Sequence, residues 1–319
     1  MKTWSRIFFL WLSIAAVASA ATGEVSKLKV TILSTMLADG QALGEWGFSA
    51  LVEADGHRIL FDTGAHEDLV LKNAQTLGID LSEVPDVILS HSHWDHVGGL
   101  LTLRKAMAAK SPNALALAHV GEGIFYSRTE EGTPGESNPM IAIKPQYEAT
   151  GGRFFTHTAP MELYPGIWLT GPVPRKYPER NWSGDGKVKG PNGVVEDTIR
   201  EDIALVCVTA QGFVIVTGCG HAGVVNIVDY TRSFLGPQPV HALIGGIHLF
   251  NASDATVTWT GQKLKEFGVQ NFIGAHCTGI ETVYLLRPLL GLDREHAVVG
   301  AVGADFILGH GIDAGRIVR

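Results

Sequence analysis

Four potential metal ligands lie within six residues, in the stretch HSHWDH at positions 91–96. Residues i and i+2 of an extended strand point to the same side, so His91 and His93 present two imidazoles to one ion. Asp95 and His96 follow as the chain turns, and they are placed to hold a second ion. We expect Gly98 and Gly99 to let the backbone pass close to the metals. This density of ligands predicts a dinuclear metal site rather than a hydrogen-bonded polar loop.

Two ions need more ligands than this motif contains, so distant residues must complete the site. Three later histidines each follow an apolar run: His221 follows FVIVTGCG, His248 follows ALIGGI, and His276 follows FIGA. We expect His221 to complete one ion and His276 the other. We expect His248 to be catalytic, either by protonating a leaving group or by hydrogen-bonding a substrate oxyanion. Cys219 and Cys277 neighbour these histidines rather than each other in sequence, and we expect both to be reduced and to lie near the metals.

The elements that must position these residues form two strand-rich halves. Strands or hairpins are predicted at 27–35, 48–64, 84–93, 203–220, 240–249 and 271–279, and helices at 96–110, 224–234 and 255–268. The two halves predict two sheets packed face to face with helices outside, and the histidines then stand where buried strands end.

An insert around 121–200, rich in Gly, Pro, Thr and Glu, separates the two halves and is expected to be irregular. It carries Arg175, Lys176 and Arg180, which would suit a phosphate or carboxylate of a substrate if the segment borders the pocket. We take Arg175 as the candidate substrate-binding residue. The alternative is a solvated charged loop.

The first twenty residues resemble a cleaved export signal. Lys2 and Arg6 precede an apolar run, and Ala18 and Ala20 provide a small-residue cleavage site. The run is roughly a dozen residues, shorter than the roughly 20 that a membrane-spanning helix needs. We therefore expect residues 1–20 to be a signal peptide and 21–319 a single domain, periplasmic or secreted, with no membrane contact after cleavage.

The charge balance narrows the class of partner. The chain of 319 residues has a net charge of −7, and removal of Lys2 and Arg6 with the signal makes the mature protein more acidic. A nucleic-acid partner needs a basic face for its phosphates, so we expect none. The expected partner is a small-molecule substrate.

The motifs HSHWDH and LFDTG, the latter with Asp62, resemble the signature of the metallo-β-lactamase superfamily. Segments such as VTGCGHAGVVN, IGGIHL and GAHCTG look like the branch of ribofuranosylaminobenzene 5'-phosphate synthase-like hydrolases. The resemblance implies an α/β protein with an αββα sandwich, two divalent metal ions and a bridging hydroxide. Cys219 stands where many members have a bridging aspartate, and we assign it to substrate binding. WLTGPVPR lacks the histidine usual in better-known members, and His221 fills this vacancy.

These observations predict an exported dinuclear hydrolase that uses a metal-bound hydroxide on a small ester, lactone, amide or phosphoester. Asp95 would orient the nucleophile as well as bind metal. Zinc is the default ion for this ligand set, with iron or manganese as alternatives. The rival functions are a pterin-precursor synthase-like transferase, and a metal- or ligand-binding module without turnover. A cytoplasmic substrate pool would not be met after export, which argues against the transferase.

Overall fold

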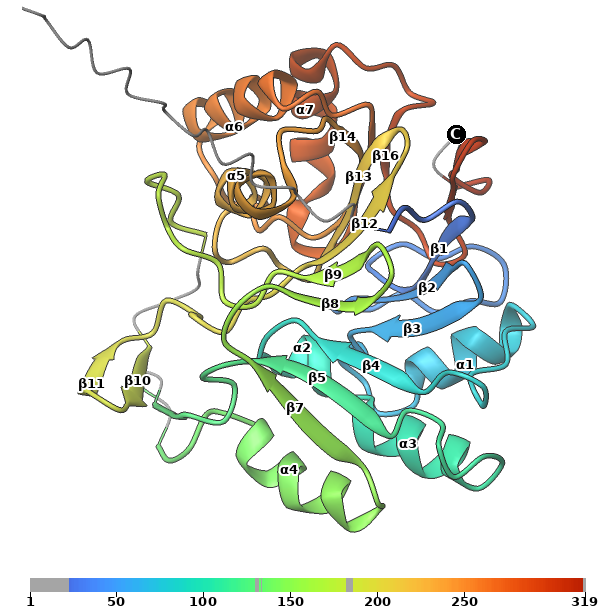
Figure 1. Cartoon of the computed structure of the whole chain (residues 1–319), viewed down its shortest axis with the longest axis vertical. Helices are drawn as coiled ribbons and strands as arrows, with labels where there is room; N and C mark the ends of the chain where they lie inside the picture. The colour runs from blue at the N-terminus through green and yellow to red at the C-terminus, as the bar shows by residue number, and fades with distance from the viewer. Residues whose placement is uncertain (1–22, 130–131, 133, 182–185, 318–319) are drawn as a thin grey trace, which may run out of the picture.

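Two mixed β-sheets packed face to face form the centre of the molecule, in a computed structural model that describes residues 23–129, 132, 134–181 and 186–317 (Figure 1). The first sheet has eight strands, in the spatial order β18 (Gly311–Asp313), β17 (Asp305–Ile307), β1 (Leu28–Ser34), β2 (Ser49–Ala54), β3 (His57–Phe61), β4 (Asp86–Leu89), β5 (Leu117–Gly121) and β7 (Arg153–His157). The second has seven, in the order β16 (Ala297–Val299), β15 (Asn271–Gly274), β14 (Val240–Gly245), β13 (Gly212–Thr217), β12 (Leu205–Thr209), β9 (Ile167–Leu169) and β8 (Met161–Tyr164).

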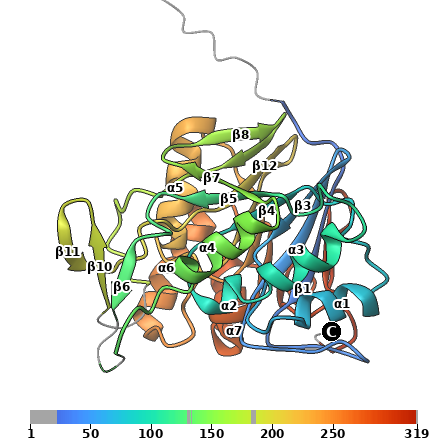
Figure 2. The ribbon, with the colours of Figure 1, turned by 90° about the horizontal axis from the view of Figure 1, so that it is seen from below.

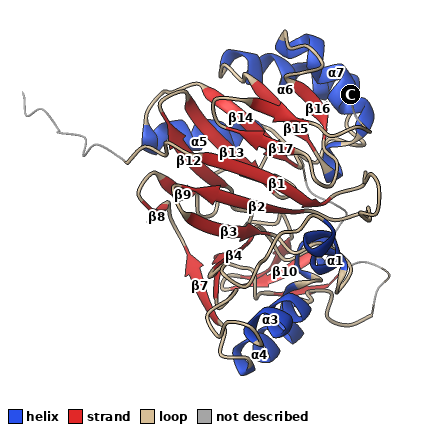
Figure 3. Cartoon of the chain, turned by 90° about the vertical axis from the view of Figure 1, so that its right-hand side faces the viewer, coloured by secondary structure: helices blue, strands red, loops and turns tan. Residues whose placement is uncertain are grey.

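Helices cover the outer face of each sheet. The seven α-helices of the described chain are α1 (Leu69–Thr76), α2 (Trp94–Val97), α3 (Leu100–Ala108), α4 (Met140–Ala149), α5 (Val224–Leu235), α6 (Asp254–Glu266) and α7 (Ile280–Leu290). Figure 3 shows α1, α3 and α4 beside the first sheet and α5, α6 and α7 beside the second. The expected αββα sandwich is confirmed.

Three apolar layers hold this arrangement together. One lies between the sheets, where Ile32 and Phe61 meet Leu205 and Ile244. The second packs the other face of the second sheet against α5, α6 and α7, and the third packs the first sheet against α1, α3 and α4. Strands β13, β14 and β15 run parallel and are buried throughout, because both of their faces are covered. Because these strands are parallel and adjacent, their carboxyl ends lie together at one edge of the sandwich.

The insert around 121–200 is irregular only in part, which corrects the expectation. It contains α4, β7, β8 and β9, and a small three-stranded sheet of β6 (Ser127–Thr129), β10 (Lys187–Gly190) and β11 (Gly193–Glu196). This small sheet projects from the side of the sandwich (Figure 2). The sequence pattern was weak because α4 buries only Met140 and Tyr147 and because β11 is exposed along its whole length.

Residues 1–20, expected to be a signal peptide, lie outside the described residues. Within the described part of the chain, no helix is long and apolar enough to cross a membrane.

Candidate metal centre

The candidate site forms where neighbouring strands of both sheets end. His91 and His93 follow β4 of the first sheet, whereas His221, His248 and His276 follow β13, β14 and β15 of the second. Because those three strands are adjacent and parallel, their carboxyl ends deliver the three later histidines to one place. The strand-end pattern in the sequence thus becomes one cluster in space.

One group consists of His91, His93 and His221. Their ring centroids lie 4.6 Å (His91–His93), 4.7 Å (His91–His221) and 4.9 Å (His93–His221) apart. His91 and His221 are fully buried, and ligand atoms of both lie within 4.8 Å of each other and of the Cys219 sulfur. Three imidazoles this close can hold one ion.

A second group consists of Asp95, His96 and His276. The Nε2 atoms of His96 and His276 are 3.3 Å apart, and Asp95 Oδ2 lies 3.3 Å from His276 Nε2 and 4.0 Å from His96 Nε2. Cys219 Sγ is 3.1 Å from His96 Nε2. Two imidazoles and a carboxylate converge here, with Cys219 at the junction between the two groups. The structure therefore brings together all six residues that the sequence suggested as metal ligands.

Oxygen atoms contact the Nδ1 atoms of three candidate ligands, His91, His96 and His221. Asp62 Oδ2 lies 2.7 Å from His96 Nδ1 and also accepts a 2.7 Å hydrogen bond from the Ser90 hydroxyl. Ser90 Oγ is in turn 2.9 Å from His91 Nδ1, and the carbonyl oxygen of Asn181 contacts His221 Nδ1. When Nδ1 donates outward, Nε2 is left as the free ligand atom facing the centre.

Backbone strain also concentrates at the site. Asp62 has a φ of +56°, and His248 and His276 each have a φ of +48°, a region that residues other than glycine seldom occupy. Such conformations persist where the surrounding structure imposes them, and they are frequent at functional sites. Here each of these residues turns the backbone sharply after a strand, and the turn directs its side chain toward the site.

Burial and neighbouring charges divide the imidazoles into two classes. Loss of hydration lowers the pKa of His91 and His221 well below the usual range and that of His93 to about 4. Burial would also lower the pKa of His96, but the carboxylates of Asp62 and Asp95 raise it to about 9. Neutral imidazoles are ready to bind a cation, whereas His96 must release a proton when it does so.

Asp95 keeps its charge despite its burial. Burial alone would raise its pKa, but the charge on His96 and the hydrogen bond from His276 hold the pKa of this carboxyl well below its usual range. The second group therefore contains a permanent negative charge to balance a divalent ion.

Buried nitrogen atoms of the candidate ligands are suited to bind metal ions. Among the described side chains, His91 Nε2, His221 Nε2 and His276 Nδ1 are buried and have no hydrogen-bond partner. A buried polar atom without a partner is costly, on the order of 1–3 kcal/mol, and ligation to a cation would remove this cost for the two Nε2 atoms, which face the cluster. The fold thus suggests metal binding, and these residues fit a divalent cation.

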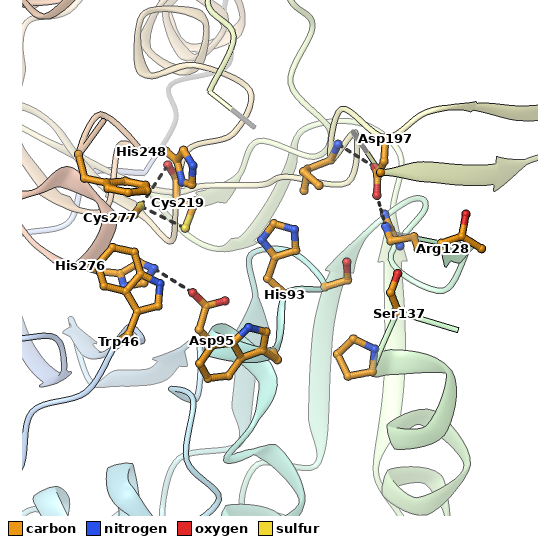
Figure 4. A pocket seen from close by; sticks show the side chains of 17 residues that line it. Trp46, His93, Asp95, Arg128, Ser137, Asp197, Cys219, His248, His276 and Cys277 are labelled. Carbon is orange, nitrogen blue, oxygen red and sulfur yellow. Dashed lines mark hydrogen bonds and ion pairs between the residues drawn. The ribbon is translucent and has the colours of Figure 1, made fainter. Parts of the chain in front are cut away.

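A cavity of about 280 Å³ opens over the centre. Figure 4 shows Trp46, Asp95 and His276 on one side and Arg128, Ser137 and Asp197 on the other. Trp46 also packs edge-on against Phe250, at a centroid distance of 5.3 Å, and both are partly exposed. The cavity therefore offers an apolar aromatic wall beside the ligands and a polar wall opposite.

The polar wall is built on one arginine paired with two carboxylates. Arg128 forms ion pairs of 2.6 Å with both Asp197 and Glu201, and Ser92 donates a 2.9 Å hydrogen bond to Glu201. This network ties the small projecting sheet to the loop between His91 and His93. Sequence reasoning missed it, because nothing in the pattern of the insert links Arg128 to residues about seventy positions away.

Arg175, the predicted substrate-binding residue, is not brought to this cavity. Its guanidinium donates hydrogen bonds to the backbone carbonyls of His221 and Thr198, so it supports the loop that carries a ligand. Cys219 and His248, by contrast, line the cavity as expected. Lys176 pairs with Asp229 on the surface.

The expectation for Gly98 is also corrected. A Cβ atom there would lie 1.9 Å from the carbonyl oxygen of Ala65, in the loop after β3, which is the nearest atom to that position. The glycine lets the helical turn that carries Asp95 and His96 pack against this loop. It therefore supports the ligands rather than making room for the ions.

Comparison with known proteins now places this site in a family. The model of the metallo-β-lactamase superfamily matches residues 47–157. The chain is 32% identical over 286 residues to a 7,8-dihydropterin-6-methyl-4-(β-D-ribofuranosyl)-aminobenzene-5'-phosphate synthase of Methanocaldococcus jannaschii, covering 86% of this chain and 96% of that protein.

Solved structures agree with this placement. Tm1679, described as a metal-dependent hydrolase of the β-lactamase superfamily, superposes with a TM-score of 0.69 at 26% identity and covers 87% of this chain and 98% of its own. The metallo-β-lactamase fold protein YhfI from Bacillus subtilis has a TM-score of 0.54 at 15% identity, covers 88% and 100%, and supports the fold alone.

The fold, the HSHWDH motif and these relatives together define a metallo-β-lactamase superfamily protein, and this chain belongs to that superfamily. Within it, the chain resembles the branch of the ribofuranosylaminobenzene 5'-phosphate synthases.

Proposed function

We propose that this protein is an exported, dinuclear metal-dependent hydrolase of a small ester, lactone, amide or phosphoester. The observation that carries the proposal is the convergence of two ligand groups, each drawn from both halves of the chain, at the side of an open cavity. His91, His93 and His221 would hold one ion, and Asp95, His96 and His276 the other. Zinc is the default ion, and iron or manganese remain alternatives.

When bound, the two ions supply Lewis acidity and a hydroxide nucleophile near neutral pH. The chain itself supplies orientation. Asp95 is charged and hydrogen-bonded to His276, so its carboxylate can also accept a hydrogen bond from the nucleophile. His248 lines the cavity beside the ligands, where its imidazole donates a proton to the leaving group.

The walls of the cavity suggest how a substrate is held. The aromatic wall of Trp46 and Phe250 suits the apolar or ring portion of a small molecule. Arg128 is already paired with two carboxylates. The opposite wall therefore suits a neutral polar group of the substrate better than an anionic one. Cys219 lies at the junction of the two ligand groups, where its sulfur would contact the substrate.

The second candidate is a synthase of the kind named for the archaeal relative, which is favoured by 32% identity over most of both chains. The export proposal argues against it. The third, a binding module without turnover, is disfavoured because all six proposed ligands are present and converge.

The test is a substrate panel on zinc-loaded protein spanning residues 21–319. We expect metal-dependent hydrolysis of at least one ester, lactone, amide or phosphoester, and loss of this turnover in Asp95→Asn. Asp86→Asn is the matched control, because Asp86 bonds His119 and Tyr164 away from the cavity. Formation of the 7,8-dihydropterin-6-methyl-4-(β-D-ribofuranosyl)-aminobenzene-5'-phosphate for which the archaeal relative is named, without hydrolysis of the panel, would instead support the synthase. Bound metals with no turnover of either kind would support the binding module.

A further inference from the structure

Two of the three cysteines form a compact group with a histidine at the edge of the metal centre. Cys219 follows β13, and Cys277 lies in the short 3-10 helix η1 (His276–Thr278) after β15. Their sulfur atoms are 3.1 Å apart, and both cysteines are free. One ligand atom from each of Cys219, Cys277 and His248 lies within 4.8 Å of the other two.

The surroundings of Cys219 and Cys277 differ from those of a cysteine packed in the apolar core. Cys207 belongs to the apolar layer between the sheets, whereas Cys219 and Cys277 belong to none of the three apolar clusters. Cys219, Cys277 and His248 all line the cavity over the metal centre, and Figure 4 shows their side chains side by side on one wall. The two sulfurs are therefore buried yet reachable by an ion that enters the cavity.

We propose that Cys219, Cys277 and His248 form a third metal site, selective for a thiophilic cation such as Cu(I). Thiolates are soft ligands that favour Cu(I), whereas sites built from imidazole and carboxylate favour zinc, iron or manganese. Each thiol that becomes a ligand releases its proton, so binding is a cation-for-proton exchange without a redox step.

The site is rigid before any ion binds. A Cβ atom at Gly246 would lie 2.7 Å from Cys277 Sγ and 2.2 Å from the carbonyl oxygen of Gly218, so only glycine leaves room for the sulfur. His248 hydrogen-bonds to Cys277 and is held at a φ of +48°. Ligands that are already in place lose little conformational freedom on binding.

The third site has a consequence for the first two. Cys219 is shared, because its sulfur also lies 3.1 Å from His96 Nε2 and belongs to the group of His91 and His221. A thiophilic ion bound to Cys277 and His248 would engage this sulfur and occupy the cavity wall beside the dinuclear centre. Excess Cu(I) should therefore inhibit a zinc-loaded enzyme. This consequence rests on the proposed function, but the site itself does not.

The test is a Cu(I) titration of reduced, zinc-loaded protein against a Cu(I) chelator, followed by desalting and analysis of both metals. We expect wild-type protein to retain two zinc ions and to take up one Cu(I). Cys277→Ala and His248→Ala should lose the Cu(I), and Cys207→Ala, the matched control at a buried cysteine outside the cavity, should keep it. Circular dichroism checks that each variant is folded.

The possible failures are distinguishable. Uptake of Cu(I) by Cys277→Ala and His248→Ala with unchanged affinity would overturn the third site. So would wild-type protein that keeps two zinc ions but takes up no Cu(I). Wild-type protein that binds one Cu(I) through Cys277 but no zinc would leave this site standing and overturn the dinuclear centre.

Discussion

Replacement of Asp62 by asparagine should weaken both halves of the metal centre without changing its shape. Asp62 is fully buried and makes three hydrogen bonds of 2.7 Å, from Ser90 N to Oδ1, from Ser90 Oγ to Oδ2, and between Oδ2 and His96 Nδ1. Ser90 Oγ in turn contacts His91 Nδ1. One carboxylate thus orients a proposed ligand of each ion.

Asparagine has nearly the same size but can accept at only one of the two positions. If its oxygen faces Ser90 N, its amide group faces His96, and His96 must then accept at Nδ1 and carry its proton on Nε2. That nitrogen faces the centre, 3.3 Å from His276 Nε2, and a protonated nitrogen cannot bind metal. The flipped amide would instead place two buried donors against each other at Ser90 N.

The expected loss is that of an outer-shell partner, about 10–100-fold in metal affinity, or about 1.4–2.7 kcal/mol. It is measured by competition for zinc with a chelator of known affinity. Asp55→Asn is the control, because Asp55 also accepts hydrogen bonds from a serine hydroxyl and from backbone amides, but in an exposed turn away from the site. Asp62→Asn protein that is folded and binds both zinc ions as tightly as wild type would refute the argument.

Three further predictions concern pH, packing and processing. The pKa of His93 is lowered to about 4 in the folded metal-free protein. As pH falls from 6.5 to 4, the unfolded chain takes up a proton at His93 and the folded protein does not, so the folded protein becomes less stable. The His93→Asn variant should therefore gain up to about 3 kcal/mol relative to wild type over that range in urea unfolding, and an unchanged difference would contradict the shift. Gly98→Ala should destabilise the fold by about 1–3 kcal/mol, because its Cβ would lie 1.9 Å from the carbonyl oxygen of Ala65, whereas Gly190→Ala, with no neighbour closer than 3.7 Å, should not. N-terminal sequencing of protein from an exporting host should begin at or next to Ala21, and retention of Met1 would remove the export proposal.

The convergence of the candidate ligands was predictable from the sequence because a histidine at the end of an apolar strand leaves a local pattern. His221, His248 and His276 each follow such a run, and parallel strands then bring their ends together. The paired sheets followed from the same runs, since strands buried on both faces are apolar throughout.

The walls of the cavity could not be predicted, because they depend on contacts between distant segments. Arg128 meets Asp197 and Glu201 only when the insert folds back over the sandwich. Arg175 has the chemistry of an anion-binding residue, but its guanidinium is committed to backbone carbonyls. Charge and residue type alone do not distinguish these two arginines, since the difference lies in their partners.

The most direct test of the dinuclear centre is the zinc content of purified protein, wild type against His221→Ala and His276→Ala. We expect two zinc ions per wild-type chain, loss of one with either substitution, and loss of turnover in parallel. His248→Ala should keep both zinc ions and lose mainly turnover. Two zinc ions bound with unchanged affinity by His221→Ala would contradict the assignment, and Cys219 would then be the better candidate for that ligand.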